Sequence, residues 1–249
     1  MLKLKSIKTQ LILYLAGFAV FLSVKDRDAA FLIMTIIAAV SALAAESIIL
    51  YLKTRAFQIT ESSIITGLII GFVLSSDEAW WKFVLASSLA ILSKQLIRFR
   101  KKHIFNPAAL GLFLTLIFFN AATQWKGTYL WYILLPFGAY FVLKLKKIEI
   151  LIAYAAVALA LFGIQAALQK VALWHIFGYL SYFYIFIMVI EPKTTPVKAI
   201  GKFSFGAALA ALIFILTQYG VKFDVELFSL LMLNITVPLL NKMPQKKEE

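Results

Sequence analysis

A lysine lies inside an apolar run in the segment ILSKQLIRFRKKHIFNPAALG, residues 91–111. A charged Lys94 at the centre of a bilayer costs roughly 2.5–3.5 kcal/mol on insertion scales, so we expect it to face protein or water and to serve a function. The alternative is snorkelling, because Lys94 precedes Arg98 by one helical turn and its long stem could carry the ammonium group to the membrane interface.

Polar and proline-containing segments interrupt several apolar runs, and we expect helical hydrogen bonding to fail there. Interrupted helices in membranes commonly line a cavity. The alternative is that Pro and Gly only kink a membrane helix. The four segments are Thr60-Glu61-Ser62-Ser63 with Thr66-Gly67, then Asn106-Pro107, Glu191 to Pro196, and Asn234-Ile235-Thr236-Val237-Pro238.

Composition assigns the chain to the integral membrane proteins, since 62% of its 249 residues are hydrophobic. Apolar stretches are centred near residues 17, 40, 68, 88, 112, 136, 159, 182, 210 and 232. At about 20 residues per span they leave little chain for loops. The sequence therefore predicts an all-α polytopic membrane protein with about ten transmembrane helices, forming a single membrane domain over residues 1–249.

Lysine and arginine are distributed unevenly between the predicted loops. With the N-terminus inside, the inner loops and tails hold 18 of the 25 cations and the outer loops hold 6. The bias predicts a multi-pass protein of the cell (inner) membrane with both termini in the cytoplasm. Its expected contacts are the lipid bilayer and no nucleic acid. The alternative for the first twenty-odd residues is a secretory signal peptide, although no small-x-small cleavage site follows Leu22.

Cysteine and histidine limit the chemistry that the chain can perform. The absence of cysteine excludes disulfides, iron–sulfur clusters and thiolate catalysis within it. His103 and His175 are far apart in sequence and lack a carboxylate cluster, so we expect each to be an interfacial or packing residue. We expect no metal site and no catalytic residue.

A weak internal repeat relates the two halves of the chain. A displacement of 120 residues aligns KFVLASSLAIL (82–92) with KFSFGAALAAL (202–212), with five identities in eleven positions, which chance could produce. These segments fall in spans four and nine, which run in opposite directions. The pattern favours two inverted five-helix repeats with broken helices, residues 1–125 and 126–249, and a site at the midplane between them.

Five motifs occur in a fixed order along the chain. They are AAES with Glu46, the run SSIITGLIIGFVLSS followed by Trp80-Trp81, SKQL with Lys94-Gln95, FNPAALG with Asn106-Pro107, and NITVPLLN. Together they resemble the NqrB/RnfD family, which includes RnfD of the Rnf electron-transport complex and its homologue NqrB of the sodium-translocating NADH:quinone reductase. The resemblance covers residues 40–120 and 182–241, in the family's order.

The resemblance implies a ten-helix, flavin-associated component of an electron-transport complex that couples redox chemistry to cation translocation, a non-autonomous part of an ion-translocating oxidoreductase. Other membrane subunits are the implied partners. The chain departs from the family in its outer loop, residues 120–129, where neither Thr123 nor Thr128 lies in the segment that carries covalent FMN. A flavin, riboflavin or FMN, would therefore be held noncovalently. The family's late Asp-Pro appears as Glu191-Pro192.

The candidate site combines polar residues of the interrupted spans. Hydroxyl and amide groups would hydrogen-bond a flavin, Lys94 could stabilise its reduced anionic form, and Glu46 and Glu191 are candidate ion-path carboxylates. The candidate cofactor-binding residues are Ser62, Thr66, Gly67, Lys94, Gln95, Asn106, Glu191, Thr194, Thr195, Asn234 and Thr236.

Two other functions fit the same residues. A cofactor-free transporter or channel for a small polar solute could use the same scaffold, and the lost covalent-flavin loop favours it. An assembly scaffold without a site of its own is the third. A flavin absorbance spectrum of the purified protein distinguishes the first hypothesis from the other two.

Overall fold

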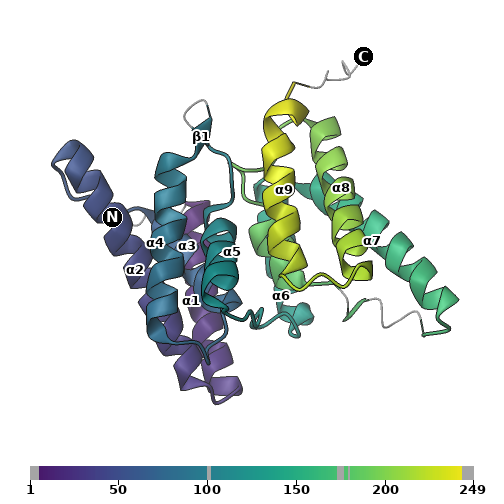
Figure 1. Cartoon of the computed structure of the whole chain (residues 1–249), viewed down its shortest axis with the longest axis horizontal. Coiled ribbons are helices and arrows are strands. Elements are labelled where there is room, and N and C mark those ends of the chain that lie inside the picture. The colour runs from purple at the N-terminus through teal and green to yellow at the C-terminus, as the bar shows by residue number, and fades with distance from the viewer. Residues whose placement is uncertain (1–5, 100–101, 173–176, 179, 243–249) are drawn as a thin grey trace. The chain divides into compact units, whose positions relative to one another are not determined.

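The computed structural model describes residues 6–99, 102–172, 177–178 and 180–242. Most of this part of the chain is helical (Figure 1). Four of the helices are long and apolar enough to cross a membrane: α1 (Ile7–Lys25), α2 (Ala29–Thr54), α7 (Ile148–Leu168) and α8 (Ala199–Gln218). The prediction of an all-α polytopic membrane protein is therefore confirmed.

The remaining helices are shorter than a full membrane crossing. They are α3 (Glu61–Val73), α4 (Trp80–Leu96), α5 (Pro107–Phe119), α6 (Trp131–Lys144), the π-helix η2 (Tyr184–Met188) and α9 (Val225–Leu240). Every predicted apolar centre lies in one of these helices or the four long ones except residue 182, which is helical and directly precedes η2. The cationic loop after α4 contains the antiparallel strands β1 (Arg98–Phe99) and β2 (Lys102–His103), which hydropathy did not indicate.

The chain divides into two compact units. Unit 1 comprises residues 1–103 and 107–127, and unit 2 comprises residues 104–106 and 128–249. In unit 1, α2 packs against α3 and α4, and α4 packs against α5. In unit 2, α8 packs against both α7 and α9. The inverted relationship between residues 1–125 and 126–249 stays a prediction.

Small residues set how closely the helices of unit 1 approach. A Cβ atom added at Gly67 of α3 would lie 2.5 Å from the Ala38 carbonyl oxygen of α2, and one added at Gly111 of α5 would lie 2.8 Å from the Ala90 side chain of α4. Neither position can hold a larger side chain without moving a helix. Close van der Waals contacts of this kind stabilise helix packing in membranes, because apolar surfaces in lipid have no hydrophobic driving force to associate.

The outer loop completes the short helix α3. At about 1.5 Å per residue, its 13 residues span only ~20 Å of a hydrocarbon core of ~30 Å. The amide groups of Gln124 and Lys126 donate to the Val73 and Phe72 carbonyls at 2.8 and 2.7 Å. The shortened loop thus satisfies carbonyls that the helix end leaves free, as membrane depth requires.

The four expected helix interruptions have different outcomes. The helix α3 begins at the first, α5 begins at the second with Pro107 in its first turn, and residues 191–196 are not helical. The fourth expectation was wrong, because α9 continues through Pro238. Pro238 lies near the end of α9, where the missing N–H removes only the bond to the Asn234 carbonyl.

Candidate functional site

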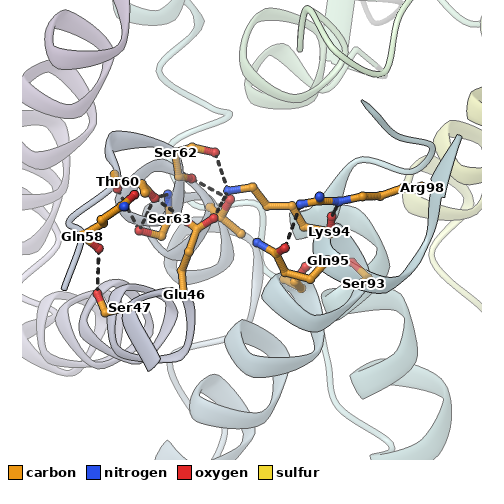
Figure 2. Close-up of polar contacts among 12 residues, drawn as sticks. Glu46, Ser47, Gln58, Thr60, Ser62, Ser63, Ser93, Lys94, Gln95 and Arg98 are labelled. Atoms are coloured by element: carbon orange, nitrogen blue, oxygen red, sulfur yellow. Dashed lines mark hydrogen bonds and ion pairs between the residues drawn. The ribbon is translucent and has the colours of Figure 1, made fainter. Parts of the chain in front are cut away.

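A buried ion pair joins α2 to α4 in unit 1. Lys94 Nζ lies 2.6 Å from Glu46 Oε1, and both residues are buried, with 6% and 3% of their surfaces exposed. Lys94 Nζ also donates to Ser62 Oγ of α3 at 2.8 Å. Figure 2 shows the ammonium group pointing at these two oxygens. Lys94 therefore faces protein, and the snorkelling alternative was wrong.

The first turn of α3 supplies the other oxygens of this cluster. Thr60 is the N-cap of α3, and its hydroxyl donates to Glu46 Oε2. Ser63, which is fully buried, donates to the Thr60 carbonyl at 2.8 Å. Glu46 is thus held through both carboxylate oxygens (Figure 2), and we call Glu46, Thr60, Ser62, Ser63 and Lys94 the carboxylate–lysine cluster.

The cluster is costly to place inside a membrane protein. Two charges leave water, and their attraction offsets the desolvation only with good geometry and additional hydrogen bonds. The 2.6 Å contact between Lys94 Nζ and Glu46 Oε1 supplies the geometry, and the hydroxyls of Thr60 and Ser62 supply the additional hydrogen bonds. Because apolar side chains of similar volume would serve stability as well, such a pair is a candidate for a functional role.

Cationic side chains converge beside the cluster at the end of α4. Lys53 Nζ and Arg98 Nη2 both donate to Gln95 Oε1, at 3.0 and 2.7 Å, and Arg98 Nε donates to the Lys94 carbonyl. Lys53 and Arg98 are exposed, whereas Gln95 is half-buried. This group, which we call the cationic rim, gives the end of α4 a positive charge that can attract an anion.

Glu61 is a second carboxylate at the start of α3, and the candidate residues chosen from the sequence did not include it. It is half-buried and accepts hydrogen bonds from the hydroxyls of Ser6, at 3.3 Å, and Thr9 of α1. Among the described residues, no lysine or arginine pairs with it. An acidic residue in a first helical turn is common for structural reasons, so its position next to Thr60 gave no separate signal.

Thr66 and Gly67 have structural roles in the observed fold. Thr66 donates to the Ser62 carbonyl one turn earlier at 2.9 Å, and Gly67 lies against the α2 backbone. Their contacts bring α3 close enough to α2 for Ser62 and Thr60 to reach the ion pair.

A second polar cluster lies in unit 2, around two asparagines that are far apart in sequence. The Asn106 amide N–H donates to Asn234 Oδ1 at 2.8 Å, and Asn106 Nδ2 donates to the Met188 carbonyl at 3.2 Å. Asn234 Nδ2 donates to the Thr194 carbonyl at 2.9 Å. Both asparagines are buried. The hydrogen bonds of Asn234 and Asn106 thus connect α9, η2 and the non-helical segment 191–196 with Asn106, which directly precedes α5.

The hydroxyls of this second cluster bond mainly to nearby groups. Thr194 donates to Glu191 Oε2 at 3.2 Å, and Thr195 donates to the Glu191 carbonyl at 2.7 Å. Thr236 donates to the Leu233 carbonyl within α9. Glu191 is half-buried. The two candidate ion-path carboxylates therefore belong to different units, Glu46 to unit 1 and Glu191 to unit 2.

Two lysines that charge counting placed in inner loops are buried in unit 2. Lys202 Nζ lies 3.0 Å from Glu149 Oε1, and Lys147 Nζ donates to the Pro196 carbonyl at 2.7 Å. Lys147 is 4% exposed and Lys202 is 8% exposed. Counting charges in predicted loops carries no signal for their burial, because it assigns a lysine to a side of the membrane and not to a contact.

Outside the membrane-spanning helices, the clearest electrostatic pair is Asp28 with Lys126, at 2.8 Å. Burial raises the pKa of Asp28, but hydrogen bonds from Lys126, the Phe31 N–H and Ser76 lower that pKa more, so it lies below its ordinary value. Burial lowers the pKa of Lys126, but Asp28 and Asp26 raise it above its ordinary value. Each charge therefore stabilises the other.

Comparison with known proteins identifies the family. The model of the NQR2, RnfD, RnfE family matches residues 2–129 and 130–248. A protein of Escherichia fergusonii, named as the D component of an ion-translocating oxidoreductase complex, is 34% identical over 103 residues, 39% of this chain and 29% of that protein. The protein of the same name from Citrobacter koseri is 37% identical over 99 residues, 38% and 28%. These alignments span less than a third of the relatives' length. Since the family model matches nearly the whole sequence, the chain belongs to the NQR2, RnfD, RnfE family.

Proposed function

We propose that this chain is a membrane component of an electron-transport complex that couples a redox reaction to cation translocation, with Glu46 on the cation path. The observation that carries the proposal is the buried Glu46–Lys94 pair, which joins α4 to α2, a helix long and apolar enough to cross a membrane. Family membership and the names of the related proteins support it. The remaining subunits of such a complex are the proposed partners, and the cell (inner) membrane with cytoplasmic termini is the proposed location.

The chemistry of the carboxylate–lysine cluster suits a displaceable cation. Lys94 Nζ occupies the position where a transported cation would meet Glu46 Oε1 and Ser62 Oγ. Carboxylate and hydroxyl oxygens are the ligands that hard cations prefer. A transported cation would bind Glu46 when the Lys94 ammonium moves away, and Lys94 would return when the cation leaves. The tethered lysine keeps the carboxylate from being unpaired between these steps.

The chain would carry a noncovalent flavin, riboflavin or FMN, which when bound supplies one- and two-electron redox chemistry. The polar residues of unit 2 and those of unit 1 would contact different parts of the flavin. In unit 2, Asn106, Asn234 and Thr195 form hydrogen bonds with groups of the protein backbone. In unit 1, the cationic rim leaves Lys53 and Arg98 exposed, which suits the phosphate of FMN. Lys94 would support a negatively charged flavin ring when its ammonium group leaves Glu46.

The flavin should dissociate when the protein is denatured. Thr123 and Thr128 are the threonines of the short loop, and neither lies in a sequence segment of the family's attachment type. A denaturing gel of the purified protein should show no fluorescent band. A band that survives denaturation would prove a covalent bond and refute this part of the proposal.

The translocation proposal is tested with the complex in inverted membrane vesicles. Redox-driven uptake of Na⁺ and of protons is measured for wild type, Glu46→Gln and Lys94→Met, with Thr217→Val as control because its hydroxyl bonds only to the Ile213 carbonyl of its own helix. We expect uptake to fall at least tenfold in the first two variants and to remain in the control. Two results together would favour the transporter hypothesis. The purified protein would contain no flavin, and Glu46→Gln would change the flux of a small solute in the absence of an electron donor.

A further inference from the structure

The turn that joins α2 to α3 in unit 1 is exposed throughout and, Lys53 excepted, takes no part in the functions above. None of the α2 residues after Glu46 is buried, and residues 51–59 are all exposed. In Figure 1 this end of α2 projects away from the other helices of unit 1. At about 1.5 Å per residue, the 26 residues of α2 span ~39 Å and extend past a hydrocarbon core of ~30 Å. We call residues 51–59 the inner turn, because the charge bias places them on the cytoplasmic side.

The inner turn presents large apolar side chains on its surface. Phe57 and Ile59 are 76% and 78% exposed. The rings of Tyr51 and Phe57 stack with their centroids 4.6 Å apart, and Ser47 Oγ donates to the Gln58 carbonyl at 3.1 Å, so the turn folds back on the end of α2. Exposed aromatic and aliphatic side chains at a helix end are typical of the boundary between lipid headgroups and acyl chains.

The inner turn also carries positive charge that no nearby carboxylate compensates. It contains Lys53 and Arg55, and no aspartate or glutamate occurs between Glu46 and Glu61. Lys53 Nζ already donates to Gln95 Oε1 in the cationic rim. Among the described residues, no carboxylate pairs with the exposed Arg55 side chain. Arg55 is therefore the cation of this turn that is available to bind an anion.

The backbone at Arg55 has a conformation that usually requires glycine. Its φ is 57°, in the left-handed region, and its N–H donates to the Tyr51 carbonyl at 2.8 Å where α2 ends. Glycine adopts this conformation at a helix end without strain, whereas a residue with a Cβ atom does not. Local strain of this kind persists where a function uses the side chain. A contact between the Arg55 guanidinium group and an anion would offset it.

We propose that the inner turn binds the headgroup of an anionic phospholipid, with Arg55 on its phosphate and Tyr51, Phe57 and Ile59 among the acyl chains. The cytoplasmic leaflet holds anionic lipids, and each Lys or Arg close to it adds about fivefold to the affinity. A guanidinium group matches a phosphate through paired hydrogen bonds. Residues 51–59 are fewer than the roughly 20–30 residues that each side of a stable protein interface contributes, which favours a lipid over a partner subunit.

The test uses the full-length protein purified in a neutral detergent. Thermal unfolding is measured while phosphatidylglycerol is added, with phosphatidylcholine, inorganic phosphate and FMN added in parallel experiments. The variants are Arg55→Gly, which removes the cation, and Arg55→Lys, which keeps it. Arg27→Gly is the matched control, because Arg27 is also exposed and has a φ of 53°, but lies between Asp26 and Asp28 in the chain.

We expect phosphatidylglycerol to raise the unfolding midpoint of wild type, Arg55→Lys and Arg27→Gly more than phosphatidylcholine does. Arg55→Gly should need about fivefold more phosphatidylglycerol for half of the shift, because one cation is lost. Without lipid, both glycine variants should unfold at a higher temperature than wild type, since glycine adopts the left-handed conformation freely. A purely structural role of Arg55 at the helix dipole would instead lower the lipid-free midpoint of Arg55→Gly and leave its lipid response unchanged.

Four outcomes would overturn the proposal. If Arg55→Gly responds to phosphatidylglycerol as wild type does, the headgroup does not bind at Arg55. If phosphatidylcholine raises the midpoint equally, the inner turn contacts lipid only through its apolar side chains. If inorganic phosphate or FMN acts through Arg55 and phosphatidylglycerol does not, the site belongs to a soluble phosphate. If phosphatidylglycerol has no effect and Arg55→Gly loses other subunits during purification of the complex, the occupant is a protein.

The lipid proposal and the translocation proposal can fail separately. Arg55 belongs neither to the carboxylate–lysine cluster nor to the cationic rim. A negative result at Arg55 therefore leaves the vesicle experiment on Glu46 unaffected, and loss of cation uptake in Glu46→Gln leaves the lipid response of Arg55 unaffected.

Discussion

Removing one partner of the buried Glu46–Lys94 pair should destabilise the protein strongly. In Lys94→Met the carboxylate keeps its Thr60 hydrogen bond but loses its counter-charge at 3% exposure. Breaking such a pair costs about 3–5 kcal/mol, because one buried charge is left uncompensated. A snorkelling or surface pair would cost only about 0–1 kcal/mol. The two cases therefore differ by more than the error of an unfolding measurement.

The double variant Glu46→Leu with Lys94→Met removes both charges and leaves only hydroxyls without their partners. Unsatisfied buried hydroxyls cost about 1–3 kcal/mol, so the double variant should be more stable than either single variant. Redox-driven cation uptake should nevertheless stay lost, since no carboxylate remains. A stable but inactive double variant would show that the pair is retained for function.

The assay is reversible unfolding in mixed micelles, followed by circular dichroism, for wild type, both single variants and the double variant. The two single costs should be non-additive by roughly 1–3 kcal/mol, as expected for groups in direct contact. If the costs simply add, or if Lys94→Met costs less than about 1 kcal/mol, the ion pair is absent in the bilayer and the proposed cation path loses its basis.

Three further predictions concern topology, packing and pH. Cysteine at Lys222 should react with an impermeant thiol reagent in intact cells and cysteine at Lys102 should not, because both positions are exposed and the charge bias places them on opposite sides. Gly67→Ala should destabilise unit 1 by about 1–3 kcal/mol, since its Cβ would lie 2.5 Å from an α2 carbonyl oxygen. The lowered pKa of Asp28 stabilises the fold above about pH 4, and this stability is lost as the pH falls through the pKa of Asp28 in the folded protein. The raised pKa of Lys126 stabilises the fold up to about pH 10.5, and this stability is lost as the pH rises further. The thermal midpoint of wild type should therefore drop at both extremes, and Asp28→Asn should abolish the acid limb.

Each of these predictions has a control or a contradicting result. Labelling at both cysteine positions would refute the span count, and labelling at the inner position alone would invert the topology. Gly17→Ala is the control for packing, because a Cβ atom there meets nothing within 4 Å, and it should stabilise slightly by restricting the unfolded chain. Asn also caps helices well, so an unchanged acid limb in Asp28→Asn would show that another carboxylate dominates.

The sequence by itself determined the protein's class and the positions of its helices, because a hydrophobic run of sufficient length is a local property that the bilayer selects. It also singled out Lys94, since charge inside an apolar run has a large cost wherever the chain folds, and it singled out Glu46 through the resemblance to the family. It failed at Pro238, whose position near the end of α9 made the missing hydrogen bond tolerable.

Only the tertiary structure decided which polar residues meet. Glu46 and Lys94 are separated by 48 residues, and Asn106 and Asn234 by 128. Those contacts depend on how closely the helices pack, for example at Gly67 against α2, and a few ångströms of displacement would separate them. Hydropathy and charge counts contain no information on that packing. For the same reason, the burial of Lys202 became visible only in the folded chain.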